Sequence, residues 1–185
     1  MAFVKAVRRG DVEELQRLLA EGADVGAVIE GGTERTALHV SSEIGFEKVV
    51  KALVEAGADA AAPDHEGSSP LHLAAAGRGN AAKVVKVLLD AGANPNARDH
   101  FKRTPLHAAA GVGRDETVRI LLKMGADFAA TDVDGRTPRF LAEHPAFQPR
   151  GFPDTVAILV AWEQKFARNQ QQAARTRELQ SLYDA

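Results

Sequence analysis

Apolar side chains recur along the chain in pairs of short stretches that are separated by glycines and polar turns. In one clear unit, an apolar run at 106–110 ends at a pair of glycines. Val118, Leu121 and Leu122 then follow at the spacing of one helix face, and residues 127–135 are polar and rich in turn-forming types. This pattern predicts two short helices joined by a turn, followed by a loop in which the chain reverses.

The same unit recurs along the chain, marked by two motifs that stay in phase. Copies of the first motif begin 33, 35 and 33 residues apart, at Thr36–His39, Ser69–His72, Thr104–His107 and, with a changed ending, Thr137–Phe140. The second motif, Gly-Ala followed by Asp or Asn, closes successive units at Gly22–Asp24, Gly57–Asp59, Gly92–Asn94 and Gly125–Asp127. A fixed internal period of this length indicates a repeat architecture.

The first motif has the chemistry of a helix start. The hydroxyl of Thr104 is suited to cap a helix, and Pro105 fits the first helical position, where its missing N–H is not needed. Gly125 supplies a left-handed residue at the end of the second helix. Helices this short are not stable alone, so we expect successive units to bury one another's apolar faces. The expected core is Leu38, Leu71, Leu106, Val50, Leu53, Val85, Leu88 and Leu122.

The period and the Thr-Pro-Leu-His block resemble the ankyrin repeat over roughly residues 3 to 165. The resemblance implies an all-α solenoid of stacked helix-turn-helix units with hairpin loops, about five in number, with the first and last as caps. We expect residues 1–168 to form this domain and residues 169–185 a polar helical tail. The implied function is a non-catalytic scaffold or adaptor that binds a protein through hairpin tips and first helices.

Several positions depart from the repeat pattern. The loop at 26–35 is two residues longer than its counterparts, and two extra residues lie near 77–80. Lys102 occupies the usual glycine position of its loop, where φ is often positive, so we expect strain or a changed turn there. The stretch 144–153 is longer by five residues and rich in proline, which suggests a lengthened loop inside a C-terminal cap.

Composition narrows the classes of function. The net charge is −2, with no basic bias of the kind that nucleic-acid binding requires. Cysteine is absent, which excludes disulfides, a cysteine nucleophile and thiolate metal sites. No apolar run approaches the roughly 20 residues that cross a bilayer, and the first ten residues do not resemble a signal peptide. We therefore expect a cytoplasmic or nuclear protein, with no nucleic acid or membrane as partner.

Three histidines in equivalent motifs, His39, His72 and His107, raise the question of a metal site. Equivalent side chains in stacked layers lie about 8–10 Å apart, whereas zinc ligands converge at about 2 Å. We expect them instead to tie neighbouring turns together by hydrogen bonds, as the resemblance implies. Hairpin carboxylates (Asp64, Asp99, Asp132 and Asp134) are expected to serve local turns. No catalytic motif appears, so we expect no enzyme activity, no metal and no cofactor.

The resemblance places the partner-binding strip on hairpin tips and the exposed side of the first helices. The expected contact residues are Glu43, Ile44, His65, Glu66, Ser68, His100, Phe101, Arg103, Val112, Val133, Asp134 and Arg136. Ile44, Phe101, Val112 and Val133 are apolar where solvent is expected, and four such residues along one strip indicate a site. Phe101 beside Arg103 is the best anchor, because aromatic and arginine side chains dominate binding hot spots. The alternative is that Phe101 packs against the neighbouring hairpin.

The partner itself cannot be named from sequence, and two other functions stay open. One is an enzyme or small-ligand site in the long loop at 144–153, which would need a pocket with convergent polar groups. The other is self-assembly of an otherwise monomeric chain into a homodimer through Leu179, Leu182 and Tyr183, which share a helical face in the tail. The tail is expected to prolong the last helix, to fold back on the cap, or to dock on a partner or second copy.

Overall fold

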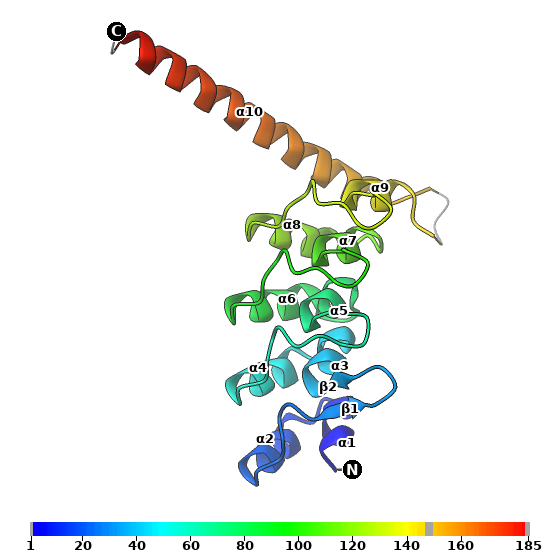
Figure 1. Ribbon diagram of the computed structural model, residues 1–185. Coiled ribbons are helices and arrows are strands. Elements are labelled where there is room, and N and C mark those ends of the chain that lie inside the picture. The colour runs from blue at the N-terminus through cyan, green and yellow to red at the C-terminus, as the bar shows by residue number, and fades with distance from the viewer. Residues whose placement is uncertain (1, 147–149, 184–185) are drawn as a thin grey trace.

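The computed structural model describes residues 2–146 and 150–183, without the side chains of 178, 179 and 181–183. Within this part of the chain, ten helices and one two-stranded sheet form a single stack of units in chain order (Figure 1). The first helices of the five units are α1 Ala2–Arg9, α3 Ala37–Ile44, α5 Pro70–Ala76, α7 Pro105–Ala110 and α9 Pro138–Glu143. The second helices are α2 Val12–Ala20, α4 Glu47–Glu55, α6 Ala81–Asp90, α8 Asp115–Lys123 and α10 Pro153–Tyr183.

The first helices begin as the motif predicts. Thr36, Ser69 and Thr104 each cap a helix, and the third helical residue in each case is a histidine whose ring accepts the cap's backbone N–H. Pro70 and Pro105 occupy the first helical position. These starts fix where each helix begins, and therefore the register in which the units stack.

The core runs through the stack as two columns of buried side chains. The expected leucines of the first helices, Leu38, Leu71 and Leu106, are at most 1% exposed and lie in the layer where α3, α5 and α7 pack in sequence. Leu53 and Leu88 form the matching column where α4 and α6 pack. Between them lie fully buried alanines in α5 and α7, whose small size allows a close approach of the helices.

The hairpin loops are helix-free, and the longest of them forms a short ladder. β1 (Val28–Glu30) pairs antiparallel with β2 (Arg35–Thr36), and this hairpin projects from the side of the stack (Figure 1). The two extra residues of this loop provide the length for the ladder. The fold is thus all-helical apart from its hairpins, as predicted, with one hairpin paired as strands.

Lys102 has the positive φ that its position in the repeat predicts. Its φ is 60°, while the equivalent residues of the adjacent hairpins, Gly67 and Gly135, have φ of 76° and 75°. A left-handed conformation costs a residue with a side chain roughly 1–2 kcal/mol. We expect Lys102→Gly to raise the free energy of unfolding by about 1 kcal/mol in urea denaturation, because glycine has no such cost.

The matched control is Lys86→Gly, in the middle of α6. The same replacement there should lower the free energy of unfolding by about 1 kcal/mol, because glycine is a poor helix former. If both variants lose stability equally, Lys102 is not strained.

Candidate functional site

A buried aspartate organises each of the three central hairpins. Oδ1 of Asp132 accepts the backbone N–H groups of Asp134 and Arg136, both at 2.9 Å, and Oδ2 accepts Nε of Arg136 at 2.8 Å. Asp99 makes the same contacts with Phe101 and Arg103. In Asp64 the backbone donors are equivalent, but the arginine, Arg35, comes from the preceding loop. These carboxylates act in local turns, as the sequence predicts.

The groups that donate hydrogen bonds to these aspartates also set their charge state. Burial alone would raise the pKa of Asp132, but the backbone and side-chain hydrogen bonds from Arg136 outweigh it and hold the pKa below its ordinary value. Burial likewise opposes the charge of Asp64, and the N–H groups of Ser68 and Glu66 reverse its effect, so that the pKa is again lowered. The charged form of both side chains, which accepts these hydrogen bonds, is therefore favoured.

The hairpin tips are joined to one another through the backbone. His65 donates its N–H to the carbonyl of Thr33 (3.0 Å), and His100 donates to Glu66 (2.9 Å). Val133 donates to Phe101 (3.0 Å). The tips therefore form one continuous edge, in which these backbone bonds set the spacing of successive hairpins. We call it the hairpin edge.

The three motif histidines join each unit to the next. In His72, Nδ1 accepts the backbone N–H of Ser69 (3.1 Å), and Nε2 lies 3.1 Å from the carbonyl oxygen of Arg103 in the following hairpin. His39 and His107 make the equivalent contacts, to the carbonyl oxygens of Ser68 and Arg136. Burial lowers the pKa of all three rings. They have the structural role expected for them, and the described residues hold no cluster of His, Cys, Asp or Glu suited to a metal ion.

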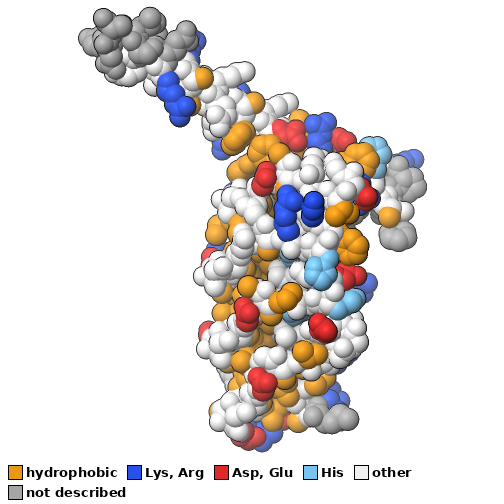
Figure 2. All heavy atoms as spheres, in the orientation of Figure 1, with side chains coloured by type: hydrophobic (Ala, Val, Ile, Leu, Met, Phe, Trp, Pro, Cys, Tyr) orange, Lys and Arg blue, Asp and Glu red, His pale blue; other side chains and the backbone are white. Residues whose placement is uncertain are grey.

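A groove lies between the hairpin edge and the first helices. One hollow of about 340 Å³ has an apolar floor that includes Leu73, Ala108, Val112 and Leu141. A second hollow of about 500 Å³ shares Leu73 with it and continues toward α3. Figure 2 shows histidine side chains beside apolar and acidic ones on the side of the stack where the hairpins lie. The arrangement offers a long, mixed surface and not an enclosed site with convergent polar groups.

The sequence matches the family model for ankyrin repeats (3 copies) over residues 3–99 and 75–170. The chain belongs to the ankyrin repeat family. The resemblance seen in the Thr-Pro-Leu-His blocks and the predicted helical repeat fold are therefore confirmed. No curated protein matches the chain. Ankyrin repeats are in general non-enzymatic modules for protein–protein interaction.

Most of the predicted contact residues lie on the hairpin edge or the groove of the ankyrin stack. Phe101, Val112 and Val133 are 46%, 41% and 52% exposed, so three of the four apolar positions are open to solvent. The other predicted residues that are exposed or half-buried are Glu43, His65, Glu66, His100, Arg103, Asp134 and Arg136.

Two of the predicted contact residues are less exposed than the prediction assumes. Ser68 is 5% exposed, because its N–H donates to Asp64 and its carbonyl oxygen lies against Nε2 of His39. It therefore belongs to the scaffold. Ile44 is half-buried and packs against the core at the end of α3, so it contributes an edge of the groove and no exposed anchor.

Phe101 is braced by its own hairpin. The guanidinium of Arg103 lies 4.7 Å from the centre of its ring, while Nε of Arg103 is held by Asp99 at 2.7 Å and its NH2 group lies 3.5 Å from Glu66. One ring face is thus covered by a fixed cation, and nearly half of the side chain remains exposed. The ring of Phe101 thus packs on Arg103 of its own hairpin, while its link to the neighbouring hairpin is a backbone one, from the N–H of Val133 to the carbonyl of Phe101.

The groove floor was missed by sequence reasoning, although the repeat contains its signal. Leu73, Ala108 and Leu141 each follow the motif's fourth residue and therefore occupy equivalent positions in successive units. Phe140, 43% exposed, stacks on His144 with ring centres 4.6 Å apart. An alignment of the units on the motif would have placed Leu73, Ala108 and Leu141 on one strip.

The long loop at 144–153 is described only in part, because residues 147–149 lie outside the described residues. Its end turns back onto α9, where Phe152 donates its N–H to the carbonyl of Ala142 (2.8 Å). The Phe152 ring lies so close to Gly113 that an added Cβ would meet it at 2.4 Å. This part of the loop is therefore packed against α9 and against the turn between α7 and α8.

The tail continues the last helix without a break, since α10 extends to Tyr183. The face predicted from Leu179, Leu182 and Tyr183 lies outside the described side chains. Among the described helices, none combines the length and apolar character needed to cross a membrane.

Proposed function

We propose that this chain is a non-catalytic binding module whose protein partner lies along the hairpin edge and groove, anchored on Phe101. The observation that carries the proposal is the braced, half-exposed ring of Phe101 beside Val133, covered by Arg103, which itself lines the groove. An anchor that is already fixed loses little conformational freedom on binding, so more of the contact energy appears as affinity.

The test is affinity capture from lysate of the source cell, with the intact chain compared with Phe101→Ala. Loss of a hot-spot aromatic costs about 2 kcal/mol or more, so we expect roughly thirtyfold weaker retention of the partner. Phe101→Ala is preferred to a change of Arg103, because the Arg103–Asp99 contact supports the hairpin itself.

Met124→Ala is the matched control, since Met124 is 47% exposed at the end of α8, outside the groove. A photo-crosslinking residue placed at Val112 should then join the partner, and one at Met124 should not. Equal retention by both alanine variants, or crosslinking from Met124 alone, would exclude the groove as the binding surface.

A further inference from the structure

The second half of α10 leaves the stack. In its first half, Leu159 is fully buried, Phe166 packs edge-on against Phe128 with ring centres 5.4 Å apart, and Glu163 pairs with Arg139 at 3.1 Å. From residue 164 to residue 177 every side chain is exposed. We call residues 164–177 the α10 arm; Phe166 near its start still packs on Phe128, and Figure 1 shows the rest of the helix pointing away from the units.

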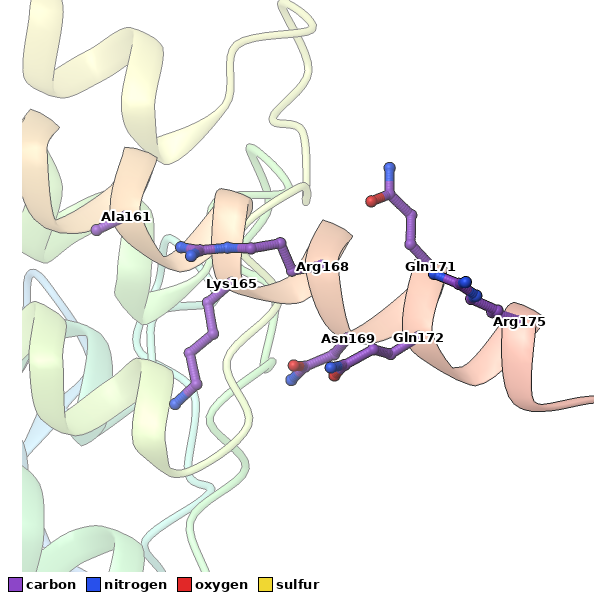
Figure 3. Close-up of a pocket in the computed structure, with 7 residues that line it drawn as sticks. All are labelled: Ala161, Lys165, Arg168, Asn169, Gln171, Gln172 and Arg175. Carbon is purple, nitrogen blue, oxygen red and sulfur yellow. The ribbon is translucent and has the colours of Figure 1, made fainter.

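The α10 arm is basic, although the whole chain is not. It contains Lys165, Arg168, Arg175 and Arg177 and no Asp or Glu, in a chain of net charge −2. The first three lie on one side of the helix, because positions three, seven and ten residues apart return to the same face. Figure 3 shows them with Gln171 and Gln172 around a shallow hollow of about 660 Å³. We call Lys165, Arg168 and Arg175 the basic face.

The basic face has no acidic partner among the side chains that the structure describes, which do not include that of Glu178. Arg168 donates to the carbonyl of Gln164 (3.3 Å) and Lys165 lies 5.4 Å from the centre of the Trp162 ring. None of the three basic residues forms an ion pair with any residue that the structure describes. A helix that is polar on most sides lacks the broad apolar face needed to lie in a membrane surface.

An acidic row lies at the far ends of the second helices. α4 ends on Glu55 and α6 on Asp90, and neither helix has a basic residue in its last turn. Asp24, Asp59 and Asp127 follow the ends of α2, α4 and α8. All five are exposed, and we call them the acidic edge.

The acidic edge contradicts the usual placement of charge on helices. The C-terminus of a helix carries partial negative charge and is stabilised by cations, so Glu55 and Asp90 add like charge where it is unfavourable. Positions that break such a local rule are expected at functional sites. At the ends of α4 and α6, the acidic edge therefore has the electrostatic character of a surface that receives a cation, whereas α2 and α8 carry Arg17 and Lys123 in their last turns.

The two surfaces also match in spacing. Stacked helices lie about 8–10 Å apart, and α4 packs directly on α6, so Glu55 and Asp90 are separated by about one layer. Arg168 and Arg175 are seven residues apart, which corresponds to about 10.5 Å along a helix. The arm points away from its own stack, so the edge that it can reach is on another molecule (Figure 1).

We propose that the basic face of the α10 arm binds the acidic edge of a second copy of this chain. The contact is made by charged side chains on exposed surfaces, so it is reversible and weakens as ionic strength rises.

Sedimentation velocity of the full chain at low and high ionic strength tests this. We expect concentration-dependent association at low ionic strength that is lost at high. Two variants test the charges: an arm-reversed variant (Lys165→Glu, Arg168→Glu, Arg175→Glu) and an edge-reversed variant (Glu55→Lys, Asp90→Lys). Each should associate at least roughly tenfold more weakly than the unaltered chain, since attraction becomes repulsion. Mixing the two variants should restore association, because each then offers the surface that the other has lost.

Arg177→Glu is the matched control. Arg177 lies two residues after Arg175 and so on nearly the opposite side of α10, and its reversal should leave association close to that of the unaltered chain. The edge-reversed variant should melt at a higher temperature, because lysine suits a helix C-terminus. That rise separates loss of contact from loss of fold.

Three results would overturn the proposal. The first is an unaltered chain that stays monomeric at low ionic strength. The second is a mixture of the reversed variants that fails to associate. The third is retention of the arm by a DNA oligonucleotide while the copies remain apart, which would make the arm a phosphate-binding element.

Discussion

Replacing Gly45 with alanine is expected to lower the free energy of unfolding by about 3 kcal/mol. Gly45 ends α3 with φ of 88°, in the left-handed region that costs other residues roughly 1–2 kcal/mol. An added Cβ would also lie 2.3 Å from the carbonyl oxygen of Arg78 and 2.8 Å from the backbone nitrogen of Asn80. Both neighbours are backbone atoms of the next unit, so relief requires the two units to separate.

Gly57→Ala is the control, and urea denaturation is the measurement. Gly57 has the same φ of 88°, but no atom lies within 4 Å of its added Cβ. It should therefore show the conformational cost alone, about 1 kcal/mol. If the two variants lose the same stability, the close approach of Gly45 to the Arg78 loop contributes nothing. A larger loss at Gly45 would show that the units are held at contact distance by backbone as well as by side chains.

Features set by residues close together in sequence could be predicted. The cap and the histidine of each motif are three residues apart. The buried hairpin aspartates accept hydrogen bonds from backbone N–H groups two and four residues later in the chain. Lys102 could be assigned a positive φ because its counterparts in the repeat are glycines. In each case the geometry follows from the local backbone conformation, and the same local sequence recurs in several units of the repeat.

Features set by packing between units could not be predicted in the same way. Whether Ile44 is exposed depends on the neighbouring unit, and Ser68 is buried because the ring of His39, 29 positions earlier in the chain, lies against its carbonyl. The course of α10 was left open, because a sequence of good helix formers does not fix where a helix leaves its support. In the structure, Phe166 packs on Phe128 close to that point.

The acidic ends of α4 and α6 show a different limit of prediction from the sequence. Glu55 and Asp90 are ordinary surface residues in the sequence, and their meaning appears only when the helix ends are aligned in one row. The same holds for the basic face, whose residues are separated by uncharged residues, mostly glutamines and alanines. Charge patterns across stacked units are visible only when the stack is known.

Acidification below about pH 6.5 is expected to destabilise the stack through His39, His72 and His107. Burial lowers the pKa of each ring in the folded state, so the unfolded chain takes up protons more readily. Stability is therefore complete above the ordinary histidine pKa of about 6.5 and is lost as the pH falls toward the lowered folded value. Each unit of pKa difference corresponds to about 1.4 kcal/mol for each histidine.

The geometry explains why the charged form is disfavoured. Nδ1 of His107 accepts the backbone N–H of Thr104 at 3.1 Å, and protonation would place a hydrogen between two donors. Nε2 of the same ring contacts the carbonyl of Arg136. A ring displaced by protonation would therefore weaken the hydrogen bond to the next hairpin. Asp64 and Asp132 act in a lower window, because their pKa values are lowered despite burial and their contribution persists until the pH falls below about 3.8.

The free energy of unfolding in urea, measured at several pH values, tests the role of the histidines. His72→Gln should lower stability at neutral pH and reduce its pH dependence between about pH 6.5 and 5 by about a third, since one of the three buried histidines no longer titrates. Val85→Ala, which removes buried apolar surface and no titrating group, should lower stability equally at every pH. If His72→Gln leaves the pH dependence unchanged, the acid sensitivity arises from other groups. The histidine hydrogen bonds between units would then be replaceable by any neutral hydrogen bond.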